Sequence, residues 1–139
     1  MSRTAQYVLD TSAVIDLPEP HELAVDGTFL VSSITVAELN AGVHTNDDPI
    51  KRANRVATLQ WLARTVDVLP FTESAAQMYG QLYAMVLSAG RNPRSRQMDL
   101  LIASVAATHR LPLVTRNAKD FRSLAPLVEV VDLGGGPDG

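Results

Sequence analysis

Short apolar runs alternate with helix-forming stretches along most of this chain, and the alternation restricts the folds open to it. Three runs have the length and composition of buried strands, namely Tyr7–Leu9, Phe29–Ser32 and Leu113–Thr115. Residues 66–69 and 128–131 show the same pattern. Because helical segments separate these runs, the sequence predicts an α/β domain with a mainly parallel central sheet and right-handed crossovers.

Several residues mark where the intervening helices begin and end. Asp48 followed by Pro49 is typical of a helix start, with the aspartate as cap and the proline in the first helical position. Thr72 is expected to cap a long helix that Gly90 ends. A short helix over residues 11–17 is expected to stop before two prolines.

The length and composition limit the class of protein. At 139 residues we expect a single domain over residues 1–133 and a flexible tail over residues 134–139. The absence of cysteine excludes disulfides and thiolate metal sites. A formal net charge of -3 argues against a protein that coats nucleic acid regardless of its sequence. The N-terminal residues resemble neither a signal peptide nor a membrane span, so a cytoplasmic protein is expected.

Four carboxylates stand at predicted junctions between strands and helices. Asp10 follows the first strand, and Glu38 follows the second by about one helical turn. Asp99 opens an apolar helix, and Asp120 lies just past the strand that comes after that helix. Since the carboxyl ends of parallel strands share one edge, where ligands bind, these side chains are expected to meet there. Mutual repulsion then favours a hard divalent cation among them, Mg²⁺ or Mn²⁺.

Each acid also has a local structural explanation. Asp10 has the position of a helix cap, and Glu38 with Thr35 has the spacing of a capping box. Asp99 lies in a first helical turn, where the helix dipole favours an anion, and Asp120 has the position of a turn cap. Local capping does not explain why all four acids fall at predicted junctions, so the set as a whole favours a metal site.

The residue types suit the hydrolysis of a phosphodiester. Mg²⁺ needs few protein ligands and keeps several waters. A water bound to the metal is easier to deprotonate, and a neighbouring carboxylate can orient it or accept its proton. The sequence therefore indicates metal-dependent phosphodiester hydrolysis by an activated water.

Four segments together resemble the PIN domain, and their order and spacing are similar to those of VapC-type toxins from bacterial toxin–antitoxin pairs. The resemblance extends from Tyr7 to Leu133. The segments that carry it are Val8–Ser12, Thr35–Leu39, Asp99–Ala103 and Val114–Phe121.

The resemblance implies a PIN-like three-layer α/β/α fold and an endoribonuclease that depends on Mg²⁺, with Mn²⁺ as a substitute. It implies that Asp10 and Asp99 bind the metal directly. Glu38 would hold a second metal or a water. Asn117 stands where some relatives carry an acid, so Asp120 is assigned the fourth acidic position. Asp120 thus completes the catalytic set of Asp10, Glu38 and Asp99.

The same resemblance suggests which residues contact the RNA substrate. Thr11 and Thr115 would position site waters or phosphate through their hydroxyl groups, unless each merely caps a turn. Arg116 follows a site strand and is a candidate for RNA contact, together with Asn117. Three more arginines precede the third acid and either contact phosphate or face solvent: Arg91, Arg94 and Arg96.

The family also implies partners, namely a homodimer and a cognate antitoxin that obstructs the acidic groove, with no membrane association. Other classes fit less well. A haloacid-dehalogenase-type phosphatase would need an acid at Ser12, and a receiver domain would need an acid beyond the third strand, whereas Asp67 lies inside it. A non-catalytic binding module, in which the acids serve only as caps, stays open as an alternative.

Overall fold

A five-stranded sheet organises the computed structural model, which describes residues 5–15, 27–45 and 47–134. Every pair of neighbouring strands is parallel, and the strand order is β3-β2-β1-β4-β5. The predicted mainly parallel sheet is therefore confirmed, and all five carboxyl ends face one edge. The strands are β1 (Gln6–Leu9), β2 (Thr28–Ser32), β3 (Asp67–Leu69), β4 (Leu113–Thr115) and β5 (Val130–Asp132).

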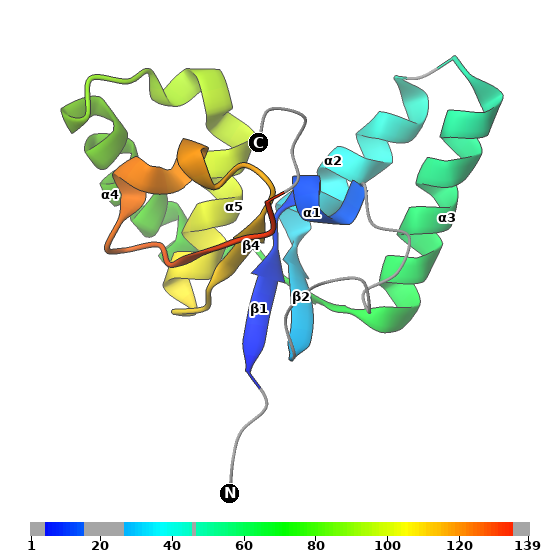
Figure 1. Cartoon of the computed structure of the whole chain (residues 1–139), viewed down its shortest axis with the longest axis horizontal. Coiled ribbons are helices and arrows are strands. Elements are labelled where there is room, and N and C mark those ends of the chain that lie inside the picture. Colours follow the sequence, from blue (N-terminus) through cyan, green and yellow to red (C-terminus); the bar gives the residue numbers. More distant parts are fainter. Residues whose placement is uncertain (1–4, 16–26, 46, 135–139) are drawn as a thin grey trace, which may run out of the picture.

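Helices cover both faces of this sheet and give three layers (Figure 1). The first three helices lie on one side, and α4, α5 and the 3₁₀ helices lie on the other (Figure 1). The α-helices are α1 (Thr11–Ile15), α2 (Ser33–His44), α3 (Pro49–Thr65), α4 (Glu73–Ser88) and α5 (Gln97–Thr108). The 3₁₀ helices are η2 (Pro93–Arg96) and η3 (Ala118–Leu124).

Alternate residues of the central strands enter two separate cores. Val8 and Leu113 pack with α4, α5 and η3, whereas Leu9 and Val114 pack with α1, α2 and α3. All four side chains are at most 2% exposed. Because burying one such side chain contributes about 1.5–3 kcal/mol, the two cores fix the strand register and therefore the position of each strand end.

Helix α5 is the most deeply buried helix on its side of the sheet. Ile102, Ala103, Val105 and Ala106 are each 0% exposed. The helix packs against α4 on one side and also reaches β2 and α2. The deep packing holds the N-terminal turn of α5 at the carboxyl edge of the sheet.

The helix boundaries agree with the sequence at the strong signals and differ elsewhere. Asp48 caps α3 by accepting a hydrogen bond from the backbone N–H of Ile50, and Thr72 caps α4, as predicted. The segment before α5, for which no helix was predicted, contains the helix η2. Strand β5 begins at Val130, two residues later than expected, because the Val128 backbone N–H donates to the Leu124 carbonyl of η3. Residues 16 and 17 of the first predicted helix, and residues 135–139 of the tail, lie outside the described residues.

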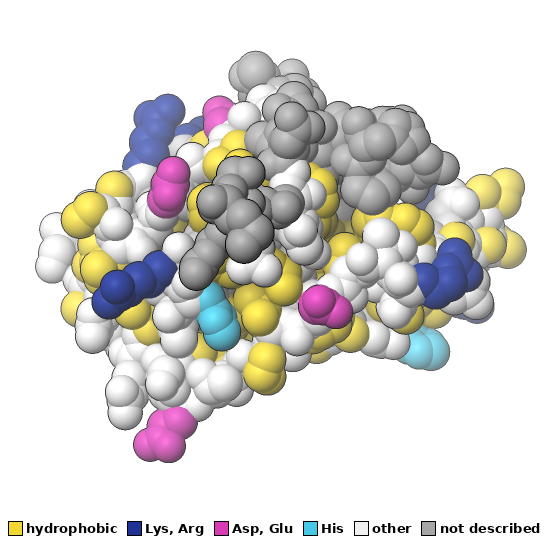
Figure 2. Space-filling view, turned by 90° about the horizontal axis from the view of Figure 1, so that it is seen from below, with side chains coloured by type: hydrophobic (Ala, Val, Ile, Leu, Met, Phe, Trp, Pro, Cys, Tyr) yellow, Lys and Arg dark blue, Asp and Glu magenta, His cyan; other side chains and the backbone are white. Residues whose placement is uncertain are grey.

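The edge at the amino ends of the strands differs from the carboxyl edge. Seen from this side, acidic and basic side chains stand apart from one another among apolar and neutral surface (Figure 2). Within the described part of the chain, no helix is both long enough and apolar enough to cross a membrane.

Candidate metal-binding active site

Asp10 is the most firmly held of the four acids. It follows β1 directly and is 2% exposed. Its Oδ1 accepts a hydrogen bond from the Thr11 backbone N–H at 2.9 Å, and its Oδ2 accepts from the Ser12 hydroxyl at 2.9 Å and the Thr115 hydroxyl at 2.8 Å. These three donors fix the orientation of the carboxylate.

The same two hydroxyls tie the loop after β4 to β1. The backbone N–H of Arg116 donates to the Ser12 hydroxyl at 3.2 Å, and that of Asn117 donates to the Thr115 hydroxyl at 3.0 Å. The Asp10 backbone N–H donates to the carbonyl of Val114 at 2.8 Å. The segment that leads to Asp120 is therefore positioned by contacts that converge on Asp10.

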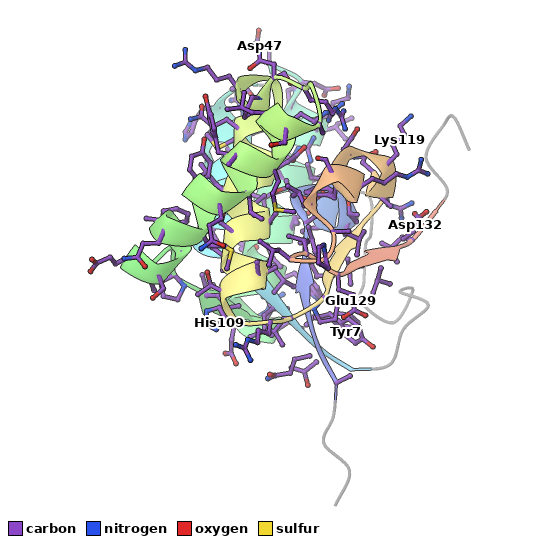
Figure 3. All side chains as sticks on the ribbon, turned by 90° about the vertical axis from the view of Figure 1, so that its left-hand side faces the viewer. Tyr7, Asp47, His109, Lys119, Glu129 and Asp132 are labelled. Atoms are coloured by element: carbon purple, nitrogen blue, oxygen red, sulfur yellow. The ribbon has the colours of Figure 1, made fainter. Side chains whose placement is uncertain are left out.

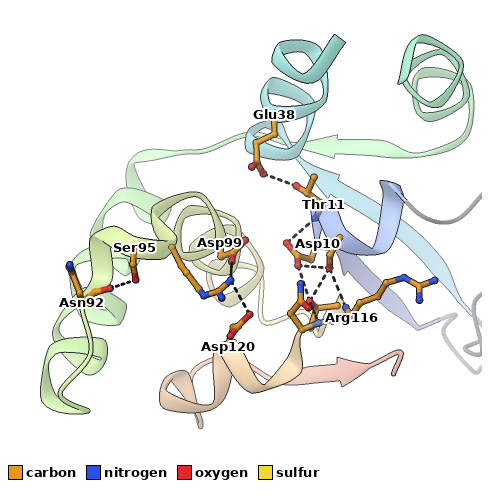
Figure 4. Close-up of polar contacts among 12 residues, drawn as sticks. Asp10, Thr11, Glu38, Asn92, Ser95, Asp99, Arg116 and Asp120 are labelled. Atoms are coloured by element: carbon orange, nitrogen blue, oxygen red, sulfur yellow. Dashed lines mark hydrogen bonds and ion pairs between the residues drawn. The ribbon is translucent and has the colours of Figure 1, made fainter. Parts of the chain in front are cut away.

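Glu38 reaches the site from α2 and does not form a capping box. The helix is capped by Ser32, whose hydroxyl accepts from the Thr35 backbone N–H at 3.2 Å. Glu38 Oε1 instead accepts from the Thr11 hydroxyl at 2.7 Å, which directs the carboxylate toward Asp10 (Figure 4). The capping-box explanation is wrong because the helix begins at Ser33, which leaves Thr35 buried inside it.

Asp99 carries the least compensated charge of the site. It lies in the first turn of α5, as expected, and its side chain is 29% exposed. Burial raises its pKa from the ordinary value of 3.8 to about 6, and the negative charges of Asp10, Glu38 and Asp120 add to this rise. Arg96 opposes the rise. The three other acids are thus close enough to act electrostatically on Asp99.

Asp120 is paired with an arginine. Its side chain, on η3, is 8% exposed, and its Oδ2 lies 3.0 Å from Nη1 of Arg96. The same nitrogen lies 3.6 Å from Oδ2 of Asp99 (Figure 4). Since Asp120 lies within η3 and Asn117 precedes that helix without a side-chain cap, the explanation of Asp120 as a turn cap is wrong.

The donor set suits a hard divalent cation. All four groups offer carboxylate oxygens, and the pKa of Asp99 is raised first by burial and then by the charges of the other acids, which a cation would offset. As the side chains stand, no three His, Asp or Glu residues in the described part of the chain are close enough to form a metal cluster. A few protein ligands suffice for Mg²⁺, which keeps much of its water, so the fit rests on two of these carboxylates.

The predicted RNA contacts occupy different surroundings. Thr115 is fully buried and holds Asp10, whereas Thr11 is partly exposed beside Glu38. The Arg116 side chain extends away from Asp99 (Figure 4), and its buried Nε has no hydrogen-bond partner among the described residues. The assignment of these residues and Asn117 to substrate stays a prediction.

The histidines that the structure describes lie apart from one another. His44 ends α2, and His109 follows α5 at the opposite end of that helix from Asp99 (Figure 3). His21 lies outside the described residues. Among the described residues, a carboxylate rather than a histidine is therefore the group available at the carboxyl edge to accept a proton.

Two residues that contact the four acids were not predicted from the sequence to do so. Ser12 donates to Asp10, and Arg96 bridges Asp99 and Asp120. Arg96 precedes Asp99 by three residues, a spacing at which side chains on a helical surface meet. That spacing was the available signal, whereas the contact with Asp120 depends on tertiary structure.

Comparison with known proteins identifies the family. A family model described as the PIN domain matches residues 7–126. The chain belongs to the PIN domain family. The resemblance seen in the four motif segments and the PIN-like α/β/α fold are thereby confirmed.

The relatives of this PIN domain include several VapC proteins. Ribonuclease VapC5 of Mycobacterium tuberculosis is 36% identical over 137 residues, which cover 94% of this chain and 98% of the relative. A crystal structure of the VapBC-5 toxin–antitoxin family member from the same organism superimposes with a TM-score of 0.79 at 35% identity, covering 92% of this chain and 98% of that one. The structure of VapBC2 from Rickettsia felis, bound to a DNA fragment from its promoter, superimposes with a TM-score of 0.74 at 26% identity. The match covers 92% of this chain and 98% of that one.

The Thr115 hydroxyl of this PIN domain can be tested by Thr115→Val, which keeps the shape of the side chain. The variant leaves the Asn117 N–H without its acceptor and removes one donor from Asp10, so we expect a loss of about 1–3 kcal/mol in the free energy of unfolding. Urea denaturation measures this change. Thr108→Val is the control, because that hydroxyl donates only to the Ser104 carbonyl of its own helix. Equal losses in the two variants would refute the linking role of Thr115.

Proposed function

We propose that this PIN domain is the toxin of a type II toxin–antitoxin pair and that it acts in the cytoplasm as a divalent-metal-dependent endoribonuclease. The observation that carries the proposal is the meeting of Asp10, Glu38, Asp99 and Asp120 at the carboxyl edge, with a surplus of negative charge at Asp99. The relatives named Ribonuclease VapC support an RNA substrate, since they match nearly the whole chain.

In this proposal Asp10 and Asp99 hold Mg²⁺, for which Mn²⁺ can substitute. A bound Mg²⁺ supplies positive charge to the scissile phosphate and makes water easier to deprotonate. Asp10 keeps its orientation through its three hydrogen-bond donors, and Glu38 keeps its orientation through the Thr11 hydroxyl. Glu38 and Asp120 orient the attacking water and accept its proton, because each has a carboxylate oxygen without a protein partner in the described structure.

Substrate and partner contacts follow from the same site. Thr11 and Asn117 lie beside the acids and would contact the RNA backbone, with Arg116 and Thr115 as further candidates. The VapBC structures are toxin–antitoxin complexes, so we infer that an antitoxin covers this acidic edge and that a basic side chain of the antitoxin neutralises it. We also infer a homodimer.

Mapping of RNA ends in cells tests the function. After induction of the wild-type chain, we expect new 5′ ends at a small set of RNA positions, because an endonuclease cuts internal bonds. Cells that express Asp10→Asn should lack these ends at equal protein level. Identical ends in both cultures would refute the proposed chemistry, and co-expression of the cognate antitoxin should suppress the ends in the wild-type culture.

Metal binding separates an enzyme from a module whose acids serve only as caps. We expect Mn²⁺ at a hundredfold excess over its dissociation constant to raise the free energy of unfolding by about 2.7 kcal/mol, since the ion binds only the folded chain. Thermal denaturation with and without a chelator measures the change. Asp10→Asn should lose most of this gain, and a wild-type chain that Mn²⁺ does not stabilise would favour the non-catalytic module.

A further inference from the structure

One arginine nitrogen connects two acids that come from different parts of the chain. Nη1 of Arg96, at the end of η2, lies 3.0 Å from Oδ2 of Asp120 and 3.6 Å from Oδ2 of Asp99 (Figure 4). Both contacts are made by the same Nη1 atom. Arg96 therefore stands among the acids in the position expected for a neutralising cation.

The two contacts differ in strength. Asp120 is 8% exposed, and Arg96 is its only side-chain partner among the described residues. Asp99 is 29% exposed, and its distance of 3.6 Å exceeds that of a direct hydrogen bond. The contact with Asp99 is thus the weaker of the two and breaks first when the Arg96 guanidinium moves.

Arg96 also has room to move. Its side chain is 51% exposed, so a shift of the guanidinium costs little desolvation. A pocket opens beside the ion pair and is lined by further polar groups, including Arg91, Asn92 and Ser95. Apolar residues such as Val86 and Leu100 also line the pocket, so the guanidinium that leaves Asp99 keeps its polar contact through Asp120.

We propose that Arg96 is a positioning residue that neutralises Asp99 and Asp120 in the metal-free chain, competes with a divalent cation for Asp99, and stays on Asp120 after the cation has bound. The proposal rests on the metal dependence proposed above. It implies that Asp120 acts from outside the metal's ligand set, because Arg96 continues to hold it.

The charge balance gives the direction of the effect. A divalent ion at Asp99 lies close to the guanidinium, and the two positive charges repel each other. Removing the arginine charge therefore strengthens metal binding, whereas removing a merely structural residue would loosen the site and weaken metal binding. The sign of the change distinguishes the two roles.

The test measures Mn²⁺ binding by isothermal titration calorimetry at mildly alkaline pH, above the pKa of Asp99. We expect Arg96→Gln to bind Mn²⁺ about fivefold more tightly than the wild type, the size of effect typical of one partly exposed charge. Arg94→Gln is the matched control, because Arg94 is an exposed arginine of the same 3₁₀ helix, and its affinity should equal that of the wild type.

The outcomes separate this proposal from the proposed function. If the wild type binds Mn²⁺ and Asp10→Asn abolishes the binding, an unchanged or weaker affinity in Arg96→Gln overturns the competition alone. If neither the wild type nor Arg96→Gln binds Mn²⁺, both the metal dependence and the competition are refuted.

If Arg96→Gln does not fold, a second measurement on the wild-type chain tests the competition between Arg96 and the cation. In a titration with diamagnetic Mg²⁺, the side-chain Nε–H resonance of Arg96 should shift in proportion to saturation, while that of Arg94 stays in place. An Arg96 resonance that does not move as Mg²⁺ binds overturns the proposal.

Discussion

Asp10→Asn is expected to lower RNA cleavage by the purified protein at least about a hundredfold, because charge stabilisation at the scissile phosphate is lost. The fold should survive the change. The asparagine oxygen can still accept from the Thr11 N–H, and its amide group can donate to the Ser12 and Thr115 hydroxyls once these rotate. Single-turnover cleavage of a labelled RNA in the presence of Mg²⁺ measures the loss.

The matched control for this prediction is Asp67→Asn. Asp67 is exposed at the amino end of β3, at the edge of the sheet opposite the acids, so cleavage should stay at the wild-type level. Circular dichroism checks that both variants are folded. Wild-type cleavage by folded Asp10→Asn would refute the assignment of this carboxylate to the metal.

Asp99→Asn is expected to change activity and stability in opposite directions. Cleavage should fall at least about a hundredfold, as for the first acid, since a metal ligand is lost. Without metal at neutral pH, however, the variant should be more stable than the wild type, because asparagine removes a partly buried charge that Asp10, Glu38 and Asp120 repel. Loss of activity together with a gain of stability is the pattern expected of an active-site residue that destabilises the fold.

The pH dependence of this gain follows from the raised pKa. The folded chain holds the Asp99 proton up to a pKa of about 6, whereas the unfolded chain releases it near 3.8. Between these values the folded state binds more protons, so the wild type loses stability as pH rises through this window. The gain in Asp99→Asn should be absent below about pH 4 and complete above about pH 6.

Urea denaturation in the presence of a chelator, at several pH values, measures this gain. We expect the free energy of unfolding of Asp99→Asn to exceed that of the wild type by on the order of 1 kcal/mol at neutral pH. This is less than the pKa shift alone implies, because the Asp99 side chain is partly exposed and solvent screens its charge. Asp67→Asn serves as the control, because Asp67 lies at the opposite edge of the sheet from the acids. If the variant were less stable than the wild type at neutral pH, the contacts of Asp99 would add more to the free energy of unfolding than its charge removes.

The sequence was sufficient for the elements whose signals are local or periodic. The strand runs around Leu9 and Val114 were recognisable because both faces of a parallel sheet are buried, which produces continuous apolar segments. Asp48 and Thr72 marked helix starts because a cap is a contact between near neighbours. The placement of Asp10 and Asp99 at the carboxyl edge followed from the strand and helix order.

Features that depend on tertiary contacts were not predictable in the same way. Glu38 had two possible partners in the sequence, and only the packing of α2 against α1 brings it to Thr11 rather than to its own helix start. The link between Arg96 and Asp120 joins two 3₁₀ helices that no periodicity relates. Such links follow from the register of β4 and the depth of α5, which emerge only in the assembled core.

The hydrogen bond between Asp10 and Thr115 spans 105 positions of the chain. Because a ribosome makes the N-terminal part first, the first acid leaves the ribosome well before the strand that holds it exists. A nascent chain that still lacks β4 has neither the Thr115 donor nor Asp120, and β1 has a neighbour on one side only. Synthesis therefore delays the complete acidic edge until β4 and η3 have been made, and a nascent chain that still lacks them cannot present it.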